Sequence, residues 1–179
     1  MSIKYGVYDK RVLQDRDGVP LVFPKFFYKV EKGYGFVASH RFESVTSGDY
    51  RDLLFENPSG SGVKAVIAEI EIVGLAQLYV DIYVNNTVTS HGTAIQPFNL
   101  NTGSPIASKM VIEYGGSYTL GDLIYNMVVP GGNRGRAIGG SVAIGETVIL
   151  VPGKNFVMRV TNSSAATTDF SVRALWWEE

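Results

Sequence analysis

Side chains suited to acid–base or metal chemistry are few and far apart in this sequence. The two histidines, His40 and His91, have no second His or Cys near them, so a metal site would need ligands from distant segments. Glu69 and Glu71 are two residues apart and share one strand face, whereas a glycosidase places its carboxyl groups on opposite sides of a sugar. The Gly-x-Ser-x-Gly motif of α/β-hydrolases does not occur. These patterns predict no catalytic residue and no metal ligand.

Two loop motifs match known ligand sites only in part. Residues 15–18 (DRDG) begin like a calcium loop but lack the later oxygen ligands, so their Asp-Gly step is interpreted as a hairpin turn. The glycine-rich stretch 131–140 contains Arg134 and Arg136, but no predicted helix follows it and it lacks the Gly-Lys-Ser/Thr of a phosphate-binding loop. We interpret the stretch as a flexible loop with two solvated arginines. If it has a role, contact with an acidic neighbour is favoured over nucleotide binding, and no cofactor is predicted.

Aromatic side chains are the remaining candidates for recognition. Trp176 and Trp177 are neighbours on a predicted strand and point to opposite faces, so one is expected in the core and the other against a second surface. Tyr79 and Tyr83 lie on the outward side of their predicted strand. Such rings suit a subunit interface or a platform on which a sugar stacks, and we favour the interface.

The elements that position these residues are predicted to be strands. Residues 63–85 show the clearest period of two and are interpreted as two long adjacent strands joined at Gly74, with apolar side chains at the even positions Val66, Ala68, Ile70, Ile72, Leu78, Val80, Ile82 and Val84. Turn-rich segments separate further predicted strands at 50–56, 109–114, 122–129, 141–151, 156–161 and 170–176, and no helix is predicted. This pattern predicts an all-β fold, an antiparallel β-sandwich with a jelly-roll-like arrangement.

The N-terminal residues differ from the rest of the chain. Residues 1–33 contain seven Lys or Arg and four Asp or Glu, a net charge of +3, whereas residues 34–179 have a net charge of −4. Short apolar runs flank the hairpin turn, and a cluster of aromatic residues follows: Phe23, Phe26, Phe27 and Tyr28. We interpret residues 1–33 as an N-terminal arm that packs on its own domain or on a neighbouring subunit, and residues 34–179 as the β-sandwich domain. A strand pair within the same sandwich is the alternative.

Composition restricts the classes of function. With 179 residues, 45% of them hydrophobic and 18% charged, the chain suits one globular domain. The net charge of −1 gives no reason to expect direct binding to nucleic acid. The sequence has no Cys, which excludes disulfides and thiolate chemistry. It contains neither a signal-peptide pattern nor a membrane-spanning apolar stretch, so we expect synthesis in the host cytoplasm and no membrane partner.

Two segments carry a resemblance to a known group of proteins. They are residues 52–62 (DLLFENPSGSG), followed by a strand ending at 73–75, and residues 151–164 (VPGKNFVMRVTNSS), followed by a strand closing at 176–179. Together they resemble β-sandwich virion proteins of phages and archaeal viruses, namely decoration, head-fibre, turret and tail modules. The resemblance covers residues 50–179 and excludes the arm. It implies a protein without enzymatic activity that forms oligomers, often trimers, with copies of itself and other virion proteins.

We therefore expect a capsid, tail or decoration subunit located in the virion. Its predicted interface residues are Phe23, Phe26, Phe27, Tyr28, Tyr79, Tyr83, Arg134, Arg136 and Trp177. Deletion of residues 1–33 is expected to leave a folded body that no longer assembles. One alternative is a carbohydrate- or receptor-binding module that uses Tyr79, Tyr83, Trp176 or Trp177 to bind a glycan. Another is a hydrolase with an unrecognised site.

Overall fold

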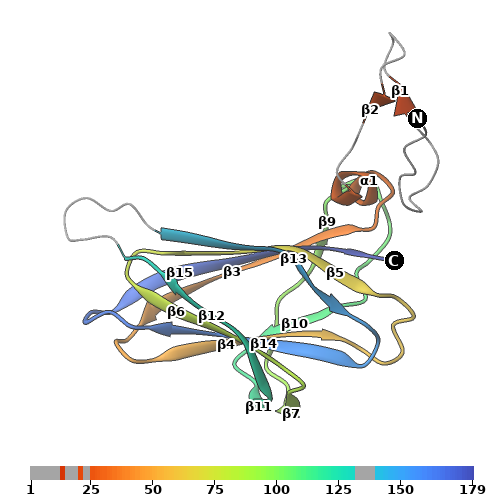
Figure 1. Cartoon of the computed structure of the whole chain (residues 1–179). Coiled ribbons are helices and arrows are strands. Elements are labelled where there is room, and N and C mark those ends of the chain that lie inside the picture. The colour runs from red at the N-terminus through yellow and green to blue at the C-terminus, as the bar shows by residue number, and fades with distance from the viewer. Residues whose placement is uncertain (1–12, 15–19, 22–24, 132–139) are drawn as a thin grey trace, which may run out of the picture.

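A computed structural model describes residues 13–14, 20–21, 25–131 and 140–179, with side chains for 25–131 and 148–179. Two antiparallel sheets pack face to face in this part of the chain, and one short helix lies outside them (Figure 1). The predicted all-β sandwich is therefore confirmed.

The two large sheets contain most of the strands. The five-stranded sheet has the order β13 (Gly140–Leu150), β5 (Ala65–Gly74), β15 (Thr168–Glu178), β3 (Gly35–Val45) and β9 (Phe98–Asn99). The six-stranded sheet has the order β12 (Asp122–Val129), β6 (Leu78–Val84), β14 (Lys154–Asn162), β4 (Tyr50–Asn57), β10 (Val111–Tyr114) and β8 (Thr93–Ala94). The remaining elements are two small strand pairs and a helix: β7 (Thr87–Ser90) with β11 (Ser117–Thr119), β1 (Leu13–Gln14) with β2 (Pro20–Leu21), and α1 (Lys25–Glu31).

Eight of the strands form a nested antiparallel series. The first pairs with the last: β3 with β15, β4 with β14, β5 with β13, and β6 with β12. Along the chain, β3, β4, β5 and β6 alternate between the two sheets. A long hairpin rolled up in this way is the jelly-roll arrangement, as the sequence predicted.

The prediction for residues 63–85 needs two corrections. Both strands exist, but β5 and β6 belong to different sheets, because the chain crosses the sandwich between them. The even-numbered positions of β5 also do not all face the core. Ile70 and Ile72 are in the core, but so are Ala65 and Ile67, because the pairing register with β15 shifts between Leu175 and Trp176. Such a bulge reverses which parity points inward.

Large side chains from both sheets fill the space between them. Phe55 and Phe156 stack with ring centroids 4.5 Å apart, and Phe36 stacks on Trp176 at 6.0 Å. Every second residue from Phe170 to Trp176 is buried in this core, which confirms the predicted inward face of β15.

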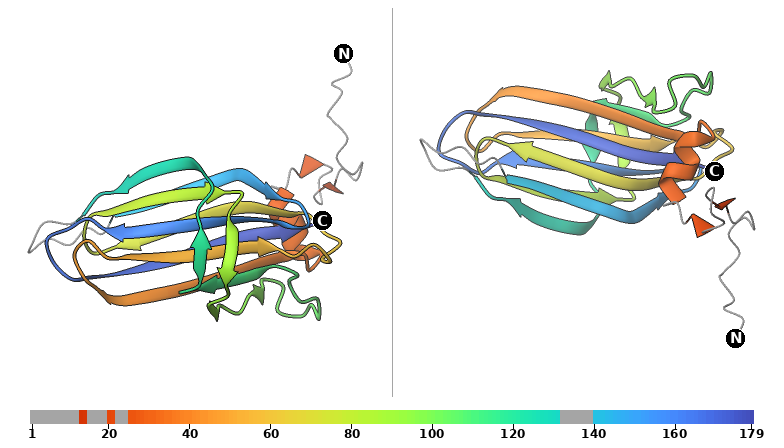
Figure 2. Two further views of the ribbon diagram at one scale, coloured as in Figure 1. Left: turned by 90° about the horizontal axis from the view of Figure 1, so that it is seen from below. Right: turned by 90° about the horizontal axis from the view of Figure 1, so that it is seen from above.

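A long insertion between β6 and β12 gives the sandwich its asymmetry. Residues 85–121 include β8 and β10, which extend the six-stranded sheet, and β9, which extends the five-stranded sheet. They also include β7 and β11, which pair with each other and cross the outer face of the six-stranded sheet (Figure 2, left). We call β7 and β11 the strap. The sequence predicted only an irregular connection at 86–108, and three short strands lie there.

The strap explains two apolar residues on the outward side of the sheet. Leu54 and Val157 are cross-strand partners on β4 and β14, and both are 0% exposed although neither belongs to the core between the sheets. Glu113, which pairs with Leu54 on its other side, accepts a hydrogen bond from Tyr118 of the strap. The strap therefore covers this part of the outer face and creates a second, smaller apolar layer.

The prediction that the chain has no helix is wrong. Residues 25–31 form α1, which lies on the outer face of the five-stranded sheet (Figure 2, right). Gly33, with φ of +80°, ends the helix in a Schellman-type motif in which Tyr34 N–H bonds to the Lys29 carbonyl. Gly35 lets the helix approach β3 closely, since a Cβ there would lie 2.4 Å from Val30 Cγ2. The predicted hairpin before the helix is confirmed, with Leu13 opposite Leu21.

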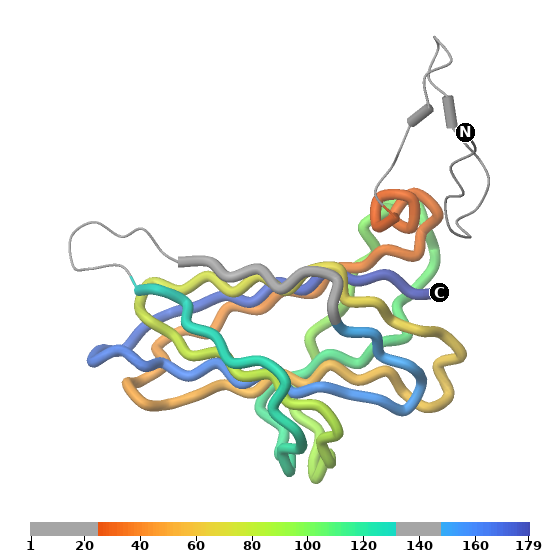
Figure 3. The backbone as a smooth tube through the Cα atoms, in the orientation of Figure 1, coloured from red at the N-terminus to blue at the C-terminus, as the bar shows by residue number. Residues whose placement is uncertain are grey.

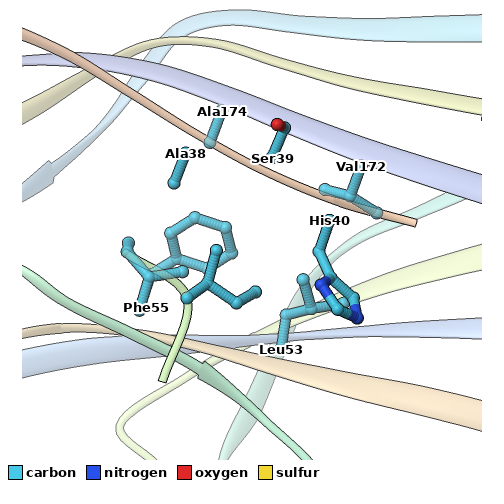
Figure 4. A pocket seen from close by; sticks show the side chains of 9 residues that line it. Ala38, Ser39, His40, Leu53, Phe55, Val172 and Ala174 are labelled. Atoms are coloured by element: carbon cyan, nitrogen blue, oxygen red, sulfur yellow. The ribbon is translucent and has the colours of Figure 1, made fainter. Parts of the chain in front are cut away.

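His40 is half-buried between the two sheets. Its ring stacks on Tyr114 at 4.3 Å, packs edge-on against Phe42 at 4.6 Å and forms no hydrogen bond with another described residue. It also lines a cavity of ≈ 10 Å³ among core side chains (Figure 4). This cavity holds at most about one water molecule and is therefore a packing defect, not a ligand site.

We expect His40 to make the protein less stable in acid. Burial lowers the pKa of His40 below its usual 6.5, so the unfolded chain takes up this proton at a higher pH than the folded chain. The free energy of unfolding should thus decrease as the pH falls below about 6.5, until it passes the folded pKa. Urea unfolding between about pH 5 and about pH 8 should show this loss, and His40→Phe should reduce it. An equal loss in His40→Phe would contradict the assignment.

Candidate functional site

The outer face of the six-stranded sheet is partly uncovered beside the strap. Cross-strand pairing of β12, β6, β14 and β4 places its side chains in two rows. One row is Val128, Tyr79, Thr161 and Tyr50, and the other is Asn126, Asp81, Arg159 and Asp52. We call these eight residues the open face. Regular alternation along four neighbouring strands brings them together, although they come from four distant parts of the sequence.

Arg159 is rigidly held at the centre of the open face. Its Nε donates to Asp52 Oδ1 and its terminal nitrogen to Asp52 Oδ2, both at 2.8 Å, and its guanidinium carbon lies 3.9 Å from the centre of the Tyr50 ring. The hydrogen bond to Asp52 raises the pKa of Arg159 despite partial burial. A bidentate, stacked arginine is preorganised, so it can present its remaining donors to a partner at little entropic cost.

Asp81 lies opposite Arg159 on β6, whereas Asp52 lies opposite Arg159 on β4. The two carboxylates differ in their contacts. The structure shows no hydrogen bond or ion pair between the Asp81 carboxylate and any other described residue. Tyr79 and Tyr83 flank it on the same face of β6, and Asn126 is its partner on β12. A shallow groove runs here, and Tyr79 and Val128 at its margin are 46% and 52% exposed. A carboxylate between phenol rings suits a lysine or arginine side chain, or a polar sugar.

A buried carboxylate ties the strap to the sandwich. Glu113 is 3% exposed, accepts a hydrogen bond from Tyr118 at 3.2 Å and lies 3.1 Å from His91 Nδ1. Burial, together with the nearby Glu113 charge, raises the pKa of Tyr118. His91 follows β7 and Tyr118 lies in β11, so one carboxylate holds both strands of the strap. The described contacts of His91 and Tyr118 with Glu113 therefore anchor the strap to the sandwich.

The second face of interest is the docking site of α1. Trp177 is 3% exposed because α1 covers it: its ring centroid lies 6.2 Å from that of Phe26, and Lys25 Nζ lies 5.1 Å above it. The Glu179 carboxylate binds Lys25 and Lys29 at 3.2 and 3.1 Å. Burial alone would raise the pKa of Glu179, but these two lysines outweigh it and lower the value.

The predicted interface residues thus separate into two places. Phe26 and Trp177 contact each other under α1, and contact of the Trp177 ring with another subunit would require the helix to move. Tyr79 and Tyr83 lie on the opposite side of the sandwich, on the outward face of β6. Phe27 is 64% exposed and Tyr28 is half-buried, both on α1. The other three predicted residues lie outside the described residues: Phe23, Arg134 and Arg136.

Several residues of the site were missed by the sequence analysis. Tyr50, Asp52 and Arg159 have outward parity, which the sequence does show, but their proximity depends on the pairing of β4 with β14. The acids singled out on β5 have a structural role, since Glu69 and Glu71 both pair with Arg173 at 2.9 Å on the outer face of the five-stranded sheet. They are not arranged as a catalytic pair.

Comparison with known proteins gives no family assignment: neither protein-family models nor curated proteins match the chain. Residues 25–131 and 148–179 contain no group of three or more His, Asp or Glu side chains able to hold a metal ion. Within the described residues, no helix has the length and apolar character that crossing a bilayer requires. Function is therefore inferred from the topology and from the open face.

Proposed function

We propose that this chain is a structural subunit of a virion, a jelly-roll β-sandwich that assembles with copies of itself and with other virion proteins. The open face carries the proposal. Two half-exposed tyrosines, an exposed valine and a fixed arginine share one flat sheet surface, and aromatic residues and arginine are enriched where proteins bind each other. The jelly-roll topology supports it, because viral capsid domains share this topology with lectins and cupins.

The open face has the physical properties of a protein contact. Tyr50 and Tyr79 lose little side-chain entropy on binding, since each has only two rotatable side-chain bonds. Arg159 is already ordered by Asp52, so a partner does not have to restrain it. The strap forms a raised border on one side of these residues (Figure 1). A partner would therefore be aligned against the strap and would bury Tyr79 and Val128 together.

A carbohydrate-binding module is the second candidate, because Asp81 and Asn126 place hydrogen-bonding groups beside the Tyr79 ring. Sugars are commonly bound by an aromatic face with polar groups at its edge. The two candidates differ in what the purified protein does alone: a structural subunit associates with itself, whereas a sugar-binding module does not need to.

Light scattering after size-exclusion chromatography tests the proposal on the full chain. We expect a mass above that of the monomer that rises with concentration, and an association at least about tenfold weaker in Tyr79→Ser/Val128→Ser, since a central contact contributes more than about 1.4 kcal/mol. Tyr34→Ser, a control at an exposed tyrosine outside the open face, should behave like the wild type. The virion assignment predicts that mass spectrometry detects the chain in purified virus particles.

A wild-type chain that stays monomeric at every concentration would contradict self-assembly. If the monomer also bound glycans on an array, and Tyr79→Ser abolished that binding, the carbohydrate-binding function would replace the proposed one.

A further inference from the structure

We propose that the open face of one copy binds the N-terminal segment, residues 1–24, of a second copy through the adjacent basic residues Lys10 and Arg11. This inference rests on the proposed self-assembly and adds the identity of the bound segment. It joins two features that the sandwich alone does not explain: a carboxylate in the groove that has no partner among the described residues, and a charged segment that precedes α1.

The acceptor is the groove around Asp81. The charge of the neighbouring Arg159 is already matched by Asp52, so a bound cation would be attracted by Asp81 and would not compete with that pair. Tyr79 lines the groove beside Asp81 and offers a ring face, and Asn126 offers a further hydrogen-bonding group. A lysine or arginine side chain can use all of these at once, through an ion pair, a cation–π contact and packing of its methylene groups.

The donor has complementary charge. Residues 1–24 contain four basic residues and three acidic residues, a net charge of +1: Lys4, Lys10, Arg11 and Arg16 against Asp9, Asp15 and Asp17. Lys10 and Arg11 are adjacent and form the highest local concentration of positive charge in the segment. Residues 34–179 have a net charge of −4. The two net charges are opposite in sign, and the adjacent pair of Lys10 and Arg11 supplies the specific contact with the groove.

The position of α1 determines which copies can be joined. Trp177, Gly35 and Glu179 hold the helix on the outer face of the five-stranded sheet, whereas the open face belongs to the six-stranded sheet on the opposite side (Figure 3). The helix and the open face thus lie on opposite sides of one copy. A reciprocal exchange of segments between two copies closes a two-fold dimer, whereas a one-way contact builds a ring or a filament.

Charge reversal tests this contact directly in the full chain. Asp81→Lys alone and Lys10→Glu/Arg11→Glu alone should each weaken association at least about tenfold in light scattering. All three substitutions in one chain should restore association toward the wild-type value, because the two charges are exchanged across the same contact. Glu43→Lys reverses an exposed acid on β3 of the five-stranded sheet and is the matched control, with no change expected. Unfolding curves confirm that each variant is folded, and Asp81→Asn replaces Asp81→Lys if the latter is not.

Each outcome separates this inference from the proposed function. If the wild type associates but Asp81→Lys does so equally well, or if the combined variant is not rescued, the segment does not bind at Asp81, while self-assembly stands. A wild type that is monomeric at all concentrations contradicts both. If Asp81→Asn abolishes binding to a glycan array without changing the mass, the groove binds sugar and this inference is wrong.

Discussion

Leu54→Ala should lower the free energy of unfolding by about 2–5 kcal/mol, as much as Leu53→Ala, although the two side chains point to opposite faces of β4. In an ordinary sandwich the outward residue would face water and its truncation would have little effect. Here the strap covers it, and Leu54 is as fully buried as its neighbour. Truncation should therefore leave a cavity beneath the strap and remove the contacts that hold it down.

Denaturant unfolding of both variants measures this effect. The control is Thr161→Ala, which lies on the same outer face but on the open side, and its free energy of unfolding should stay within about 0.5 kcal/mol of the wild type. A Leu54→Ala variant as stable as Thr161→Ala would show that the strap does not pack on the sheet in solution. The open face would then extend over a larger part of the six-stranded sheet.

Deletion of residues 1–24 and deletion of residues 1–33 should have different consequences. The shorter deletion leaves α1 in place, and we expect unchanged stability with a loss of assembly. The longer deletion removes the helix, exposes Trp177, and takes both lysine partners from Glu179. Exposure of one large aromatic side chain should cost about 2–3 kcal/mol of unfolding free energy. The sequence predicted a folded body without residues 1–33, and the structure adds that this body should be less stable than the full chain.

Tryptophan fluorescence and denaturant unfolding distinguish the two truncated proteins. Trp176 lies in the core and should emit unchanged in both, whereas exposure of Trp177 should shift the emission to longer wavelength only after the longer deletion. Identical spectra and stabilities would mean that α1 is not docked on Trp177 in solution. If the deletion of residues 1–24 is already enough to abolish assembly, the assembly contact lies in residues 1–24.

Period-two alternation predicted most strands because one face of each strand is buried. It succeeded from Phe170 to Trp176, where every second residue enters the core. It could not give the partners of a strand, so β5 and β6 were expected side by side when they lie in different sheets. The alternation also could not reveal the bulge near Ala68. At one end of this strand both faces are covered, so apolar residues occupy both parities and the shift of register leaves no mark in the hydrophobic pattern.

The sequence could predict which side chains of the site face outward, because alternation along a strand determines this, but it could not predict which of them become neighbours. Tyr79 and Tyr83 were expected to face outward, and they do. Arg159, Asp52 and Tyr50 become neighbours only through the register of β4 with β14, which pairs residues more than a hundred positions apart. The second surface expected against one of the two tryptophans is α1, which covers Trp177. The sequence did not predict this helix, because seven residues make too few turns for a helical period to be recognised.

The nested pairing of the strands has a consequence for synthesis on the ribosome. β15 separates β5 from β3, and β14 separates β6 from β4, so both sheets lack a central strand until residues 154–178 have emerged. The nascent chain up to that point offers unpaired strands on either side of two gaps. We therefore expect the sandwich to form late and almost at once, after translation has passed residue 178, with nascent strands that chaperones must keep from pairing with other chains.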